Sequence, residues 1–366
     1  MKLTTTKEQV LNAVLLAERI TGKKESLPIL SCVLLEAAGS LLVVRGTNLE
    51  AGIEVAIPGK VEAEGSAAVP AVILSQTLRS IGGDSVTFGD SEGNLSVESR
   101  GSKNLIKAIP HEEFPSLSRE SKHKGFPVSR EQLMHGIQSV VYAASPSMIR
   151  PELGSVYIAI EQGAITCVAT DSFRLAEKKV SGAAKKESSE ILVPLKHAGE
   201  LLFVLERMSA DEVHIAADDA QLTVSGGGVR FVSRAVDAQF PNYKEIIPRT
   251  FATEATLLKN DLAEVLRKAR VFSGAESQVG FHIYPKRKIF TAIARSADIG
   301  EMSDSLDAAL SGEDLDINFH IGYLADCLPS IAADSVVLGF AGAGKPLVIR
   351  PVSDQSFMYL VMPLNR

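Results

Sequence analysis

Two glycine-spaced strings in the chain have the form of motifs that carry chemistry. The first, Gly89-Asp-Ser-Glu-Gly93, matches the G-x-S-x-G string of hydrolases. In those enzymes the serine stands on a strained turn between a strand and a helix, where its hydroxyl can attack a carbonyl. Here the string joins two short apolar segments, 86–88 and 95–97. These segments predict a hairpin, so we do not assign Ser91 as a nucleophile.

The second string places Gly339 ahead of Gly344-Lys345 with the spacing of a phosphate-binding loop. Such a loop needs a serine or threonine after the lysine to hold magnesium, and a helix must follow it. Pro346 occupies the position of the hydroxyl residue, and the next segment has the pattern of a strand. This string also predicts a hairpin loop.

The histidine and cysteine residues indicate neither a metal centre nor a redox centre. The seven histidines show no H-E-x-x-H string or other paired ligand spacing. Cys32, Cys167 and Cys327 are odd in number, widely spaced and set among apolar residues, which is typical of buried free thiols in a reducing compartment. No cluster indicates general acid–base chemistry. We therefore expect no catalytic residue, no metal and no cofactor.

Length and composition predict a protein of two or three domains. The chain has 366 residues, of which 45% are hydrophobic, enough for packed cores. Its net charge of −6 excludes a globally basic nucleic-acid binder but allows a local basic patch. We find no signal-peptide core and no run of about 18 apolar residues. We expect a soluble, cytoplasmic protein that does not enter the membrane.

A similar stretch of sequence occurs three times in the chain. Each copy has an apolar helical pattern followed by an Asp-x-Val triplet at the start of alternating strands, and the copies span 69–86, 193–213 and 319–336. The three aspartates, at positions 84, 211 and 334, lie 127 and 123 residues apart. This period is too long for a solenoid unit. It predicts three similar domains, which we place at 1–122, 127–248 and 251–366.

Each repeat has the pattern helix, strands, helix, strands. Amphipathic patterns predict first helices at 7–20 and 260–271 and one that continues to about Ala144, with Thr5 or Thr6 capping the earliest. Second helices are expected at 69–82, 195–207 and 320–332. The strand-like segments alternate and are joined by short turns, as in antiparallel sheets. The fold class is therefore α+β, with an antiparallel sheet and two helices in each domain.

Two further stretches indicate a functional surface. Thr170-Asp-Ser-Phe-Arg-Leu-Ala176 lies between two strand-like segments and alone predicts only a polar turn. The last residues, 359–364, are mostly apolar. Because chain ends are usually polar and frayed, an apolar end is expected to be docked on the protein.

These stretches resemble a known family, the bacterial DNA polymerase III beta subunit, which is the processivity clamp of replication. The resemblance covers the whole chain, and the length and threefold repeat agree with it. The residues that carry it are Ser26-Leu-Pro-Ile-Leu30, Thr170–Ala176, Gln239-Phe-Pro-Asn-Tyr243, Ile246-Ile-Pro248 and Met362-Pro363.

The resemblance implies a fold and a role. Members of this family are head-to-tail homodimers in which six similar domains close a ring, with helices lining the hole and sheets outside. Double-stranded DNA threads the hole, and no reaction is catalysed. The ring tethers the DNA polymerase III alpha subunit and other proteins with a clamp-binding motif, and a clamp loader that uses ATP places it on DNA.

The resemblance also implies three groups of site residues, assigned position by position. DNA contacts are expected from Lys24, Arg79, Lys196, Ser147 and Met148. The dimer interface is expected at Ile106, Val271 and Phe272. A pocket for partner peptides that carry a Gln and two apolar anchors is expected at Arg150, Leu153, Thr170, Ser172, Phe173, Arg174, Leu175, Pro241, Ile246, His320, Tyr323, Pro346, Val361, Met362, Pro363 and Leu364.

The helices expected to line the hole carry both signs of charge. Modest attraction suits sliding, because phosphate contacts carry no sequence information and tight contacts would impede movement. Acidic residues are interspersed with the basic ones, so an ordinary solvated face stays open as an interpretation. The basic residues are Lys7, Arg19, Arg79, Arg130, Lys196, Arg207, Lys259, Arg267, Lys268 and Arg270.

The sequence departs from the family pattern at the expected pocket. Ser172 and Phe173 stand where glycine and histidine are common, so the pocket gains an apolar surface and a more restricted backbone. Glu245 stands where a basic residue is common, which is expected to alter the preference for acidic peptides.

Two other classes of protein were weighed against the clamp. An enzyme of three fused domains would need a catalytic constellation in one repeat, and we find none in the sequence. A repeat scaffold without nucleic acid would differ in its size in solution, because a ring predicts a dimer of twice 39.1 kDa.

Overall fold

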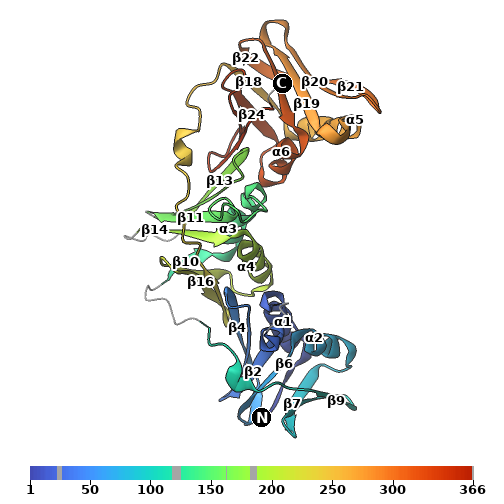
Figure 1. Ribbon diagram of the computed structural model, residues 1–366, viewed down its shortest axis with the longest axis vertical. Helices are drawn as coiled ribbons and strands as arrows, with labels where there is room; N and C mark the ends of the chain where they lie inside the picture. The colour runs from blue at the N-terminus through green and yellow to red at the C-terminus, as the bar shows by residue number, and fades with distance from the viewer. Residues whose placement is uncertain (23–26, 118–124, 162, 182–187, 365–366) are drawn as a thin grey trace. The chain divides into compact units, whose positions relative to one another are not determined.

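The computed structural model describes residues 1–22, 27–117, 125–161, 163–181 and 188–364 (Figure 1). The chain forms two compact units. The first unit is Met1–Met134 with Ser189–Asp237, and the second is His135–Ser188 with Ala238–Arg366. The middle repeat is therefore divided between the units.

Six α-helices occur in the described ranges, two in each repeat. The predictions for 7–20 and 195–207 are confirmed, but three other helices end earlier than predicted, of which the helix expected at 69–82 ends at Ser80. The helix expected to reach Ala144 ends at Gln138, before consecutive β-branched valines, and the helix expected at 320–332 ends at Asp326, ahead of Pro329. The helices are α1 (Lys7–Ile20), α2 (Ala71–Ser80), α3 (Arg130–Gln138), α4 (Leu195–Arg207), α5 (Lys259–Phe272) and α6 (Ile321–Asp326).

Strands make up most of the remaining chain. The first repeat contains β1 (Lys2–Thr6), β2 (Cys32–Ala38), β3 (Leu41–Thr47), β4 (Ala51–Pro58), β5 (Lys60–Ala63), β6 (Gly65–Pro70), β7 (Ser85–Ser91), β8 (Asn94–Ser99) and β9 (Ser102–Ile106). The middle repeat contains β10 (Phe126–Ser129), β11 (Ser155–Glu161), β12 (Ala164–Thr170), β13 (Arg174–Ser181), β14 (Ser189–Pro194), β15 (Glu212–Ala217), β16 (Gln221–Gly226) and β17 (Val229–Arg234). The third repeat contains β18 (Thr253–Leu258), β19 (Gln278–Tyr284), β20 (Ile289–Ser296), β21 (Gly300–Ser305), β22 (Ala308–Gly312), β23 (Leu315–His320), β24 (Ser335–Phe340), β25 (Leu347–Pro351) and β26 (Phe357–Val361).

A strand leads directly into every one of these helices, which the helix–strands–helix–strands pattern had missed. Val69, Val193 and Phe319, which begin the three repeated stretches of sequence, belong to β6, β14 and β23. A strand of six residues that runs straight into a helix leaves no turn residue between the two periods. Only Pro70 and Pro194, the last residues of β6 and β14, mark the boundary in the sequence.

The three aspartates that mark the repeat cap the first helices through their backbone carbonyls. The first N–H groups of a helix have no partner within the helix. The predicted side-chain cap of α1 is wrong, because the Thr6 hydroxyl donates to Gln9. The capping bonds run from Lys7 N–H to Asp84 (2.8 Å), from Arg130 N–H to Asp211 (2.9 Å) and from Lys259 N–H to Asp334 (2.8 Å).

The side chains of the same three basic residues also donate to backbone carbonyls, near the end of the second helix in each repeat. A cation at this place satisfies carbonyls that the helix leaves open and interacts favourably with the helix dipole. The acceptors are Ile81 for Lys7, Leu205 and Ala210 for Arg130, and Ile331 for Lys259. Three of the ten basic residues assigned to the helices therefore hold the fold together.

Sheets run from one repeat into the next inside each unit. In the first unit the order β10-β15-β16-β17-β4-β3-β2-β6 is joined by the pair β17–β4, and a second sheet has the order β5-β1-β7-β8-β9. In the second unit the order β11-β12-β13-β26-β25-β24-β18-β22 is joined by the pair β13–β26, and a second sheet has the order β21-β20-β19-β23. We call β4–β17 the first joint and β13–β26 the second joint. Both joints are antiparallel, as the α+β prediction requires.

Candidate functional site

A cavity of about 240 Å³ lies beside the second joint, inside the second unit. It is small for a ligand site but has the common pattern of apolar walls with a few polar groups. Its lining comes from the loop before β11, the turn between β12 and β13, the segment after the middle repeat, and the end of β26. The lining residues are Arg150, Leu153, Thr170, Ser172, Arg174, Leu175, Pro241, Asn242, Tyr243, Ile246, Leu360 and Met362.

The turn 170–174 fixes one wall of this pocket by hydrogen bonds within itself. The Thr170 hydroxyl donates to the Arg174 carbonyl (2.6 Å) and accepts the Ser172 N–H (3.2 Å). The Asp171 carboxylate accepts the N–H groups of residues 173 and 174 at 2.9 and 3.0 Å. Ser172 has φ +80°, a conformation that favours glycine. The backbone of the wall is thus fixed before any ligand arrives.

Arg174 is the main charged group of the pocket, and its side chain is only 11% exposed. Its guanidinium pairs with Asp171 (2.9 Å) and with Asp326 of α6, and it lies 4.6 Å over the Tyr323 ring. Burial alone would lower the pKa of Arg174, but the hydrogen bond to Asp326 and the neighbouring negative charges raise it above its ordinary value. Arg174 therefore stays charged and ties the turn to α6.

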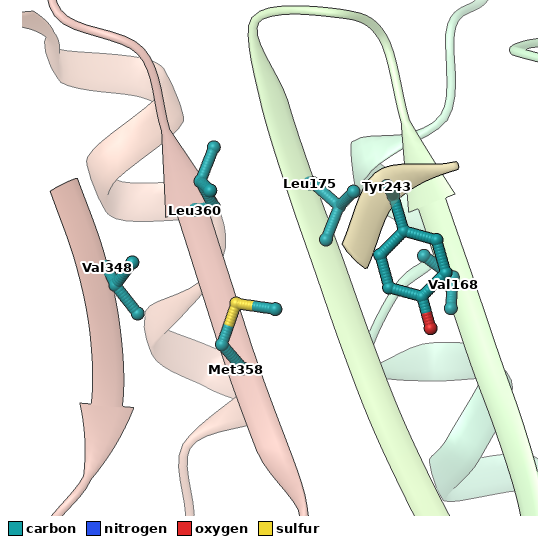
Figure 2. Close-up of a cluster of buried hydrophobic side chains, with 6 residues drawn as sticks. All are labelled: Val168, Leu175, Tyr243, Val348, Met358 and Leu360. Atoms are coloured by element: carbon teal, nitrogen blue, oxygen red, sulfur yellow. The ribbon is translucent and has the colours of Figure 1, made fainter. Parts of the chain in front are cut away.

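The floor of the pocket is a buried apolar cluster that spans the joint. Figure 2 shows Leu175 and Val168 on the two strands of the middle repeat and Leu360, Met358 and Val348 on those of the third. Tyr243 packs on the same cluster and donates its hydroxyl to Glu177 at 2.6 Å. The pKa of Tyr243 is raised, first by burial and second by the hydrogen bond to Glu177. The segment after the middle repeat is therefore fastened down where it borders the pocket.

Nine of the sixteen pocket candidates line the cavity, and the other seven lie outside its lining. Val361 is fully buried in β26, whereas Phe173, inside the wall turn, is 60% exposed. The rings of His320 and Tyr323 lie 4.6 Å apart, next to Arg174, and burial lowers the pKa of His320. Pro346, Pro363 and Leu364 are half-buried and outside the cavity lining.

Three lining residues were missed by the sequence analysis. Asn242, Tyr243 and Leu360 border the cavity but were not among the candidates. Residues 242 and 243 lie inside the Gln239–Tyr243 motif, and Leu360 lies one position before a candidate on the same strand. The motif and strand alternation would have been a sufficient signal for them.

The candidate DNA contacts are scattered over both units. Lys24 lies outside the described residues. Arg79 is exposed in the last turn of α2. Lys196 is exposed on α4 and forms an ion pair with Glu200 at 3.5 Å. Ser147 and Met148 are exposed in the loop before β11, where they bring no positive charge.

The candidate dimer residues differ in their exposure. Val271 is 62% exposed at the end of α5, and Phe272 beside it is half-buried. Ile106 is already buried within this chain, at 5% exposed. Leu105, its neighbour on β9, is 59% exposed, so it is the exposed apolar side chain of that strand.

The strings that resembled catalytic motifs are hairpins, as predicted. The segment 89–93 joins β7 to β8, and 339–345 joins β24 to β25. The three cysteines are free and buried, as predicted, and burial raises the pKa of Cys167 to about 12. Within the part of the chain that the structure describes, no group of His, Cys, Asp or Glu could hold a metal ion. No helix of the described residues is long and apolar enough to span a membrane.

Comparisons with known proteins agree with this architecture along the whole chain. Family models of the DNA polymerase III beta subunit match residues 1–118 (N-terminal domain), 127–242 (central domain) and 244–365 (C-terminal domain). The three α+β repeats, joined by continuous sheets, are the tandem domains that these models describe. The chain therefore belongs to the DNA polymerase III beta subunit family.

Relatives and solved structures match over nearly their full length. The beta sliding clamps of Synechococcus elongatus and Staphylococcus epidermidis are 24% and 23% identical, over 100% of this chain and 99% of theirs. The DNA polymerase III beta subunit of Thermotoga maritima is 25% identical, with a TM-score of 0.94 over 100% of this chain and 99% of that chain. A Pseudomonas aeruginosa sliding clamp bound to griselimycin is 23% identical, with a TM-score of 0.94 over 100% of both chains.

Proposed function

We propose that this chain is a sliding clamp, which encircles double-stranded DNA as a homodimer and confers processivity without catalysing a reaction. It tethers the DNA polymerase III alpha subunit and other proteins with a clamp-binding motif, and a clamp loader places it on DNA. The observation that carries the proposal is the match of the three family domains in tandem along the whole chain. We place the domains at 1–122, 127–248 and 251–366 and the protein in the cytoplasm.

The sheet order supports a head-to-tail dimer. Each joint within the chain pairs two strands of neighbouring repeats. The first is β4 or β13, which follows a hairpin in the first half of its repeat. The second is β17 or β26, the last strand of the next repeat. The strands that correspond to these are β21 of the third repeat and β9 of the first. Each is an edge strand, paired on one side only within this chain. Because an uncovered edge offers free backbone groups, β21 of one copy can pair with β9 of another. Val271, Phe272 and Leu105 would lie near that pairing, while Ile106 supports it from inside.

The DNA contacts are proposed at exposed residues of the helices and loops. Arg79, Lys196 and Lys24 supply the charge, and Ser147 and Met148 border the DNA without adding to it. Binding of this kind is independent of sequence and falls steeply with salt. The ring itself, and not tight binding, would keep the protein on DNA.

The pocket at the second joint is proposed to bind the peptides of partner proteins. Its apolar floor fits an apolar anchor, and the Arg174 guanidinium offers hydrogen bonds to the rest of the peptide. Two anchors contribute roughly 1.5–3 kcal/mol each on burial, against the cost of ordering a flexible peptide. We expect an affinity of about 1 μM, or about −8 kcal/mol, which permits partners to exchange. The anchors alone fall short of this value, so the hydrogen bonds to the peptide must supply the rest.

Retention on DNA after loading tests the proposal. Wild-type protein should stay on a closed circular duplex through a high-salt wash and should leave once the circle is linearised. Phe272→Ala should reduce dimerisation in sedimentation at low concentration and reduce retention in parallel. Equal retention on circular and linear DNA would exclude a topological link and overturn the proposal.

A further inference from the structure

We propose that the first joint carries a second peptide-binding pocket, which takes a partner segment with an acidic residue next to an apolar anchor. A cavity of about 300 Å³ lies beside this joint, wholly inside the first unit. It is larger than the pocket at the second joint. Its lining residues are Thr47, Leu49, Glu50, Ala51, Gly52, Pro115, Ser116, Leu117, Ala220, Gln221, Val232 and Arg234. We call it the first-joint pocket, and the site described above the second-joint pocket.

Each pocket has its own wall turn, and the two turns have the same pattern of hydrogen bonds. The Thr47 hydroxyl donates to the Ala51 carbonyl (2.9 Å) and accepts the Leu49 N–H (3.1 Å), as Thr170 does in its own turn. The Asn48 side chain accepts the N–H groups of residues 50 and 51 at 2.9 and 2.7 Å, as Asp171 does for 173 and 174. The third residue of each turn has positive φ, +76° at Leu49 and +80° at Ser172. The first joint thus repeats the backbone that fixes the second-joint pocket.

The strand register extends the equivalence across both joints. Gly52 pairs with Val232 where Leu175 pairs with Leu360. Arg234 N–H donates to the carbonyl of residue 50 at 2.8 Å, and Met362 N–H donates to that of residue 173 at 2.8 Å. Arg234 therefore stands where the second-joint pocket has Met362.

The chain segments beyond the strands are equivalent as well. Val236 N–H donates to Leu192 (2.9 Å), as Leu364 N–H donates to Asn318 (2.8 Å). The flanking segment begins with a Phe-Pro pair in both cases, at 114–115 and at 240–241. Pro115 lines the first-joint pocket, and Pro241 lines the second-joint pocket. A cavity with a turn, two paired strands and a flanking segment in the same arrangement is a duplicate of the second-joint pocket and fits the same class of ligand, an extended peptide.

The floor of the first-joint pocket is apolar and narrow. Val232 is buried, and Leu117 lies across Gly52 so closely that a Cβ at position 52 would stand 2.1 Å from its Cδ2. Leu49, at the mouth, is a large apolar side chain that is 49% exposed on a backbone conformation that costs about 1 kcal/mol or more for a residue other than glycine. A strained residue that presents an apolar side chain to solvent is typical of a binding site.

The charges at the mouth select the ligand. Arg234 places a guanidinium at the position of the Met362 thioether, and its side chain is 66% exposed. A guanidinium has five donors, whereas its ion pair with Glu50 spans 3.6 Å and is mostly exposed. An acidic side chain of a bound segment can therefore pair with Arg234 in place of Glu50. This complementarity favours an acidic residue beside the anchor, in contrast to the purely apolar anchors expected at the second joint.

Peptide binding by fluorescence anisotropy tests the proposal on the intact homodimer. The probes are labelled pentapeptides that combine one Asp or Glu with one Val, Leu or Phe, and a Gln-containing peptide with two leucines reports on the second-joint pocket. Arg234→Gln should weaken the acidic probes about tenfold, the effect of one lost charge-assisted hydrogen bond. Glu50→Gln should strengthen them, and neither change should affect the Gln-containing peptide. Wild-type hydrogen-exchange rates in the first unit, where both residues lie, show that the variants are folded.

Met362→Ala is the matched control in the other pocket, and it should weaken only the Gln-containing peptide. A photo-crosslinker on the acidic probe should label residues 47–52 or 115–117. No binding of any acidic probe at millimolar concentration would overturn the proposal, as would binding that survives Arg234→Gln or is lost with Met362→Ala. The inference rests on the proposed function only for the idea that the second-joint pocket binds peptides, and failure of DNA retention would leave these binding results unchanged.

Discussion

The two joints pair their strands in the same register, but the two residues that face each other differ between the joints at every register position. Lys178 faces Phe357 across the second joint, whereas Val55 faces Val229 at the equivalent step of the first. Two residues along the strands, Ala176 pairs with Tyr359 in the second joint, and Ile53 pairs with Phe231 in the first. Tyr359 and Phe231 are both fully buried.

This difference shows which features the backbone sets and which the side chains set. Turn, register and flanking segment recur at both joints, so the cavity beside each joint follows from the fold of the repeat. Its chemistry depends on the residues at a few register positions, such as 234 and 362. One fold can in this way carry two pockets with different linings.

Shortening the buried residue beneath each pocket should have the largest effect. Leu360→Ala removes a side chain that is 2% exposed in the cluster of Figure 2, and large-to-small changes of this kind cost about 2–5 kcal/mol. Val232→Ala at the equivalent position should cost less, about 1–2 kcal/mol, because it removes fewer methyl groups. Hydrogen exchange measured separately on peptides of the two units gives both values.

The contrast between units is the control for this comparison. Each variant should raise the exchange rate in its own unit and leave the other near the wild-type rate, because distant sites are usually independent. Equal destabilisation of both units by Leu360→Ala would show that the joints do not act separately.

The buried lysine of the second joint offers a smaller and more specific effect. The Lys178 side chain is 8% exposed, and its ammonium contacts Asp354 at 3.0 Å and Ser356 at 2.7 Å. Asp354→Asn removes the charged partner of the Lys178 ammonium. This change should lower the free energy of unfolding by about 1–3 kcal/mol at pH 7. Adding Lys178→Met should recover most of that loss, because an apolar residue at this depth no longer needs the carboxylate, as Val55 shows in the first joint.

The pH dependence of the second unit checks the same pair. Burial acts to raise the pKa of Asp354, but hydrogen bonds from Ser356 and Lys178 outweigh it and lower the pKa to about 2. The carboxylate therefore stabilises the fold above its unfolded pKa of about 3.9, and this contribution is lost as the pH falls toward 2. Asp354→Asn should remove that part of the acid sensitivity, and an unchanged acid profile would contradict the assignment.

The helices could be predicted from periodicity, but the strands before them could not. Val10, Val14 and Ala17 recur at helical spacing, and α1 has the predicted bounds. The strands β6, β14 and β23 end at the residue directly before a helix. Pro70 and Pro194 mark the end of the first two, but β23 runs into its helix without such a signal. The cap on α1 is likewise the backbone carbonyl of Asp84, just before β7 and far along the chain, which no local motif encodes.

The second-joint pocket could be predicted by resemblance, while the first-joint pocket was overlooked. Thr170-Asp171 stood out because a family motif contains it. Thr47-Asn48 has the same hydroxyl and Asx residues at the same place in its repeat, and this was a usable signal. The register that brings Arg234 next to Glu50 depends on pairing between two repeats, and sequence pattern alone does not fix such pairing.

A titrating histidine at the first joint gives the smallest expected effect. His197 of α4 is 5% exposed, and its Nδ1 is 2.9 Å from the Ser233 hydroxyl on β17. Burial, and then the charge of Lys196, lower the pKa of His197 to about 4, while Glu50 acts in the opposite direction. At the equivalent positions of the second joint stand Tyr323 and Val361, which do not titrate between pH 5 and 8.

The sign of the effect follows from the lowered pKa. The unfolded chain takes up the proton near pH 6.5 and the folded chain only near pH 4, so protons favour unfolding as the pH falls between these values. The first unit should have its full stability from this site above pH 6.5 and should lose about 1 kcal/mol by pH 5.5. His197→Gln should remove this loss from hydrogen exchange of α4, measured between pH 8 and 5.5 after correction for the intrinsic rate. His320→Gln is the matched control, because the pKa of His320 is also lowered by burial but this residue belongs to the second unit. If α4 in the His197→Gln variant still loosened between pH 6.5 and 5.5 as the wild type does, the titrating group would not be His197, and the first joint would owe its acid response to another residue.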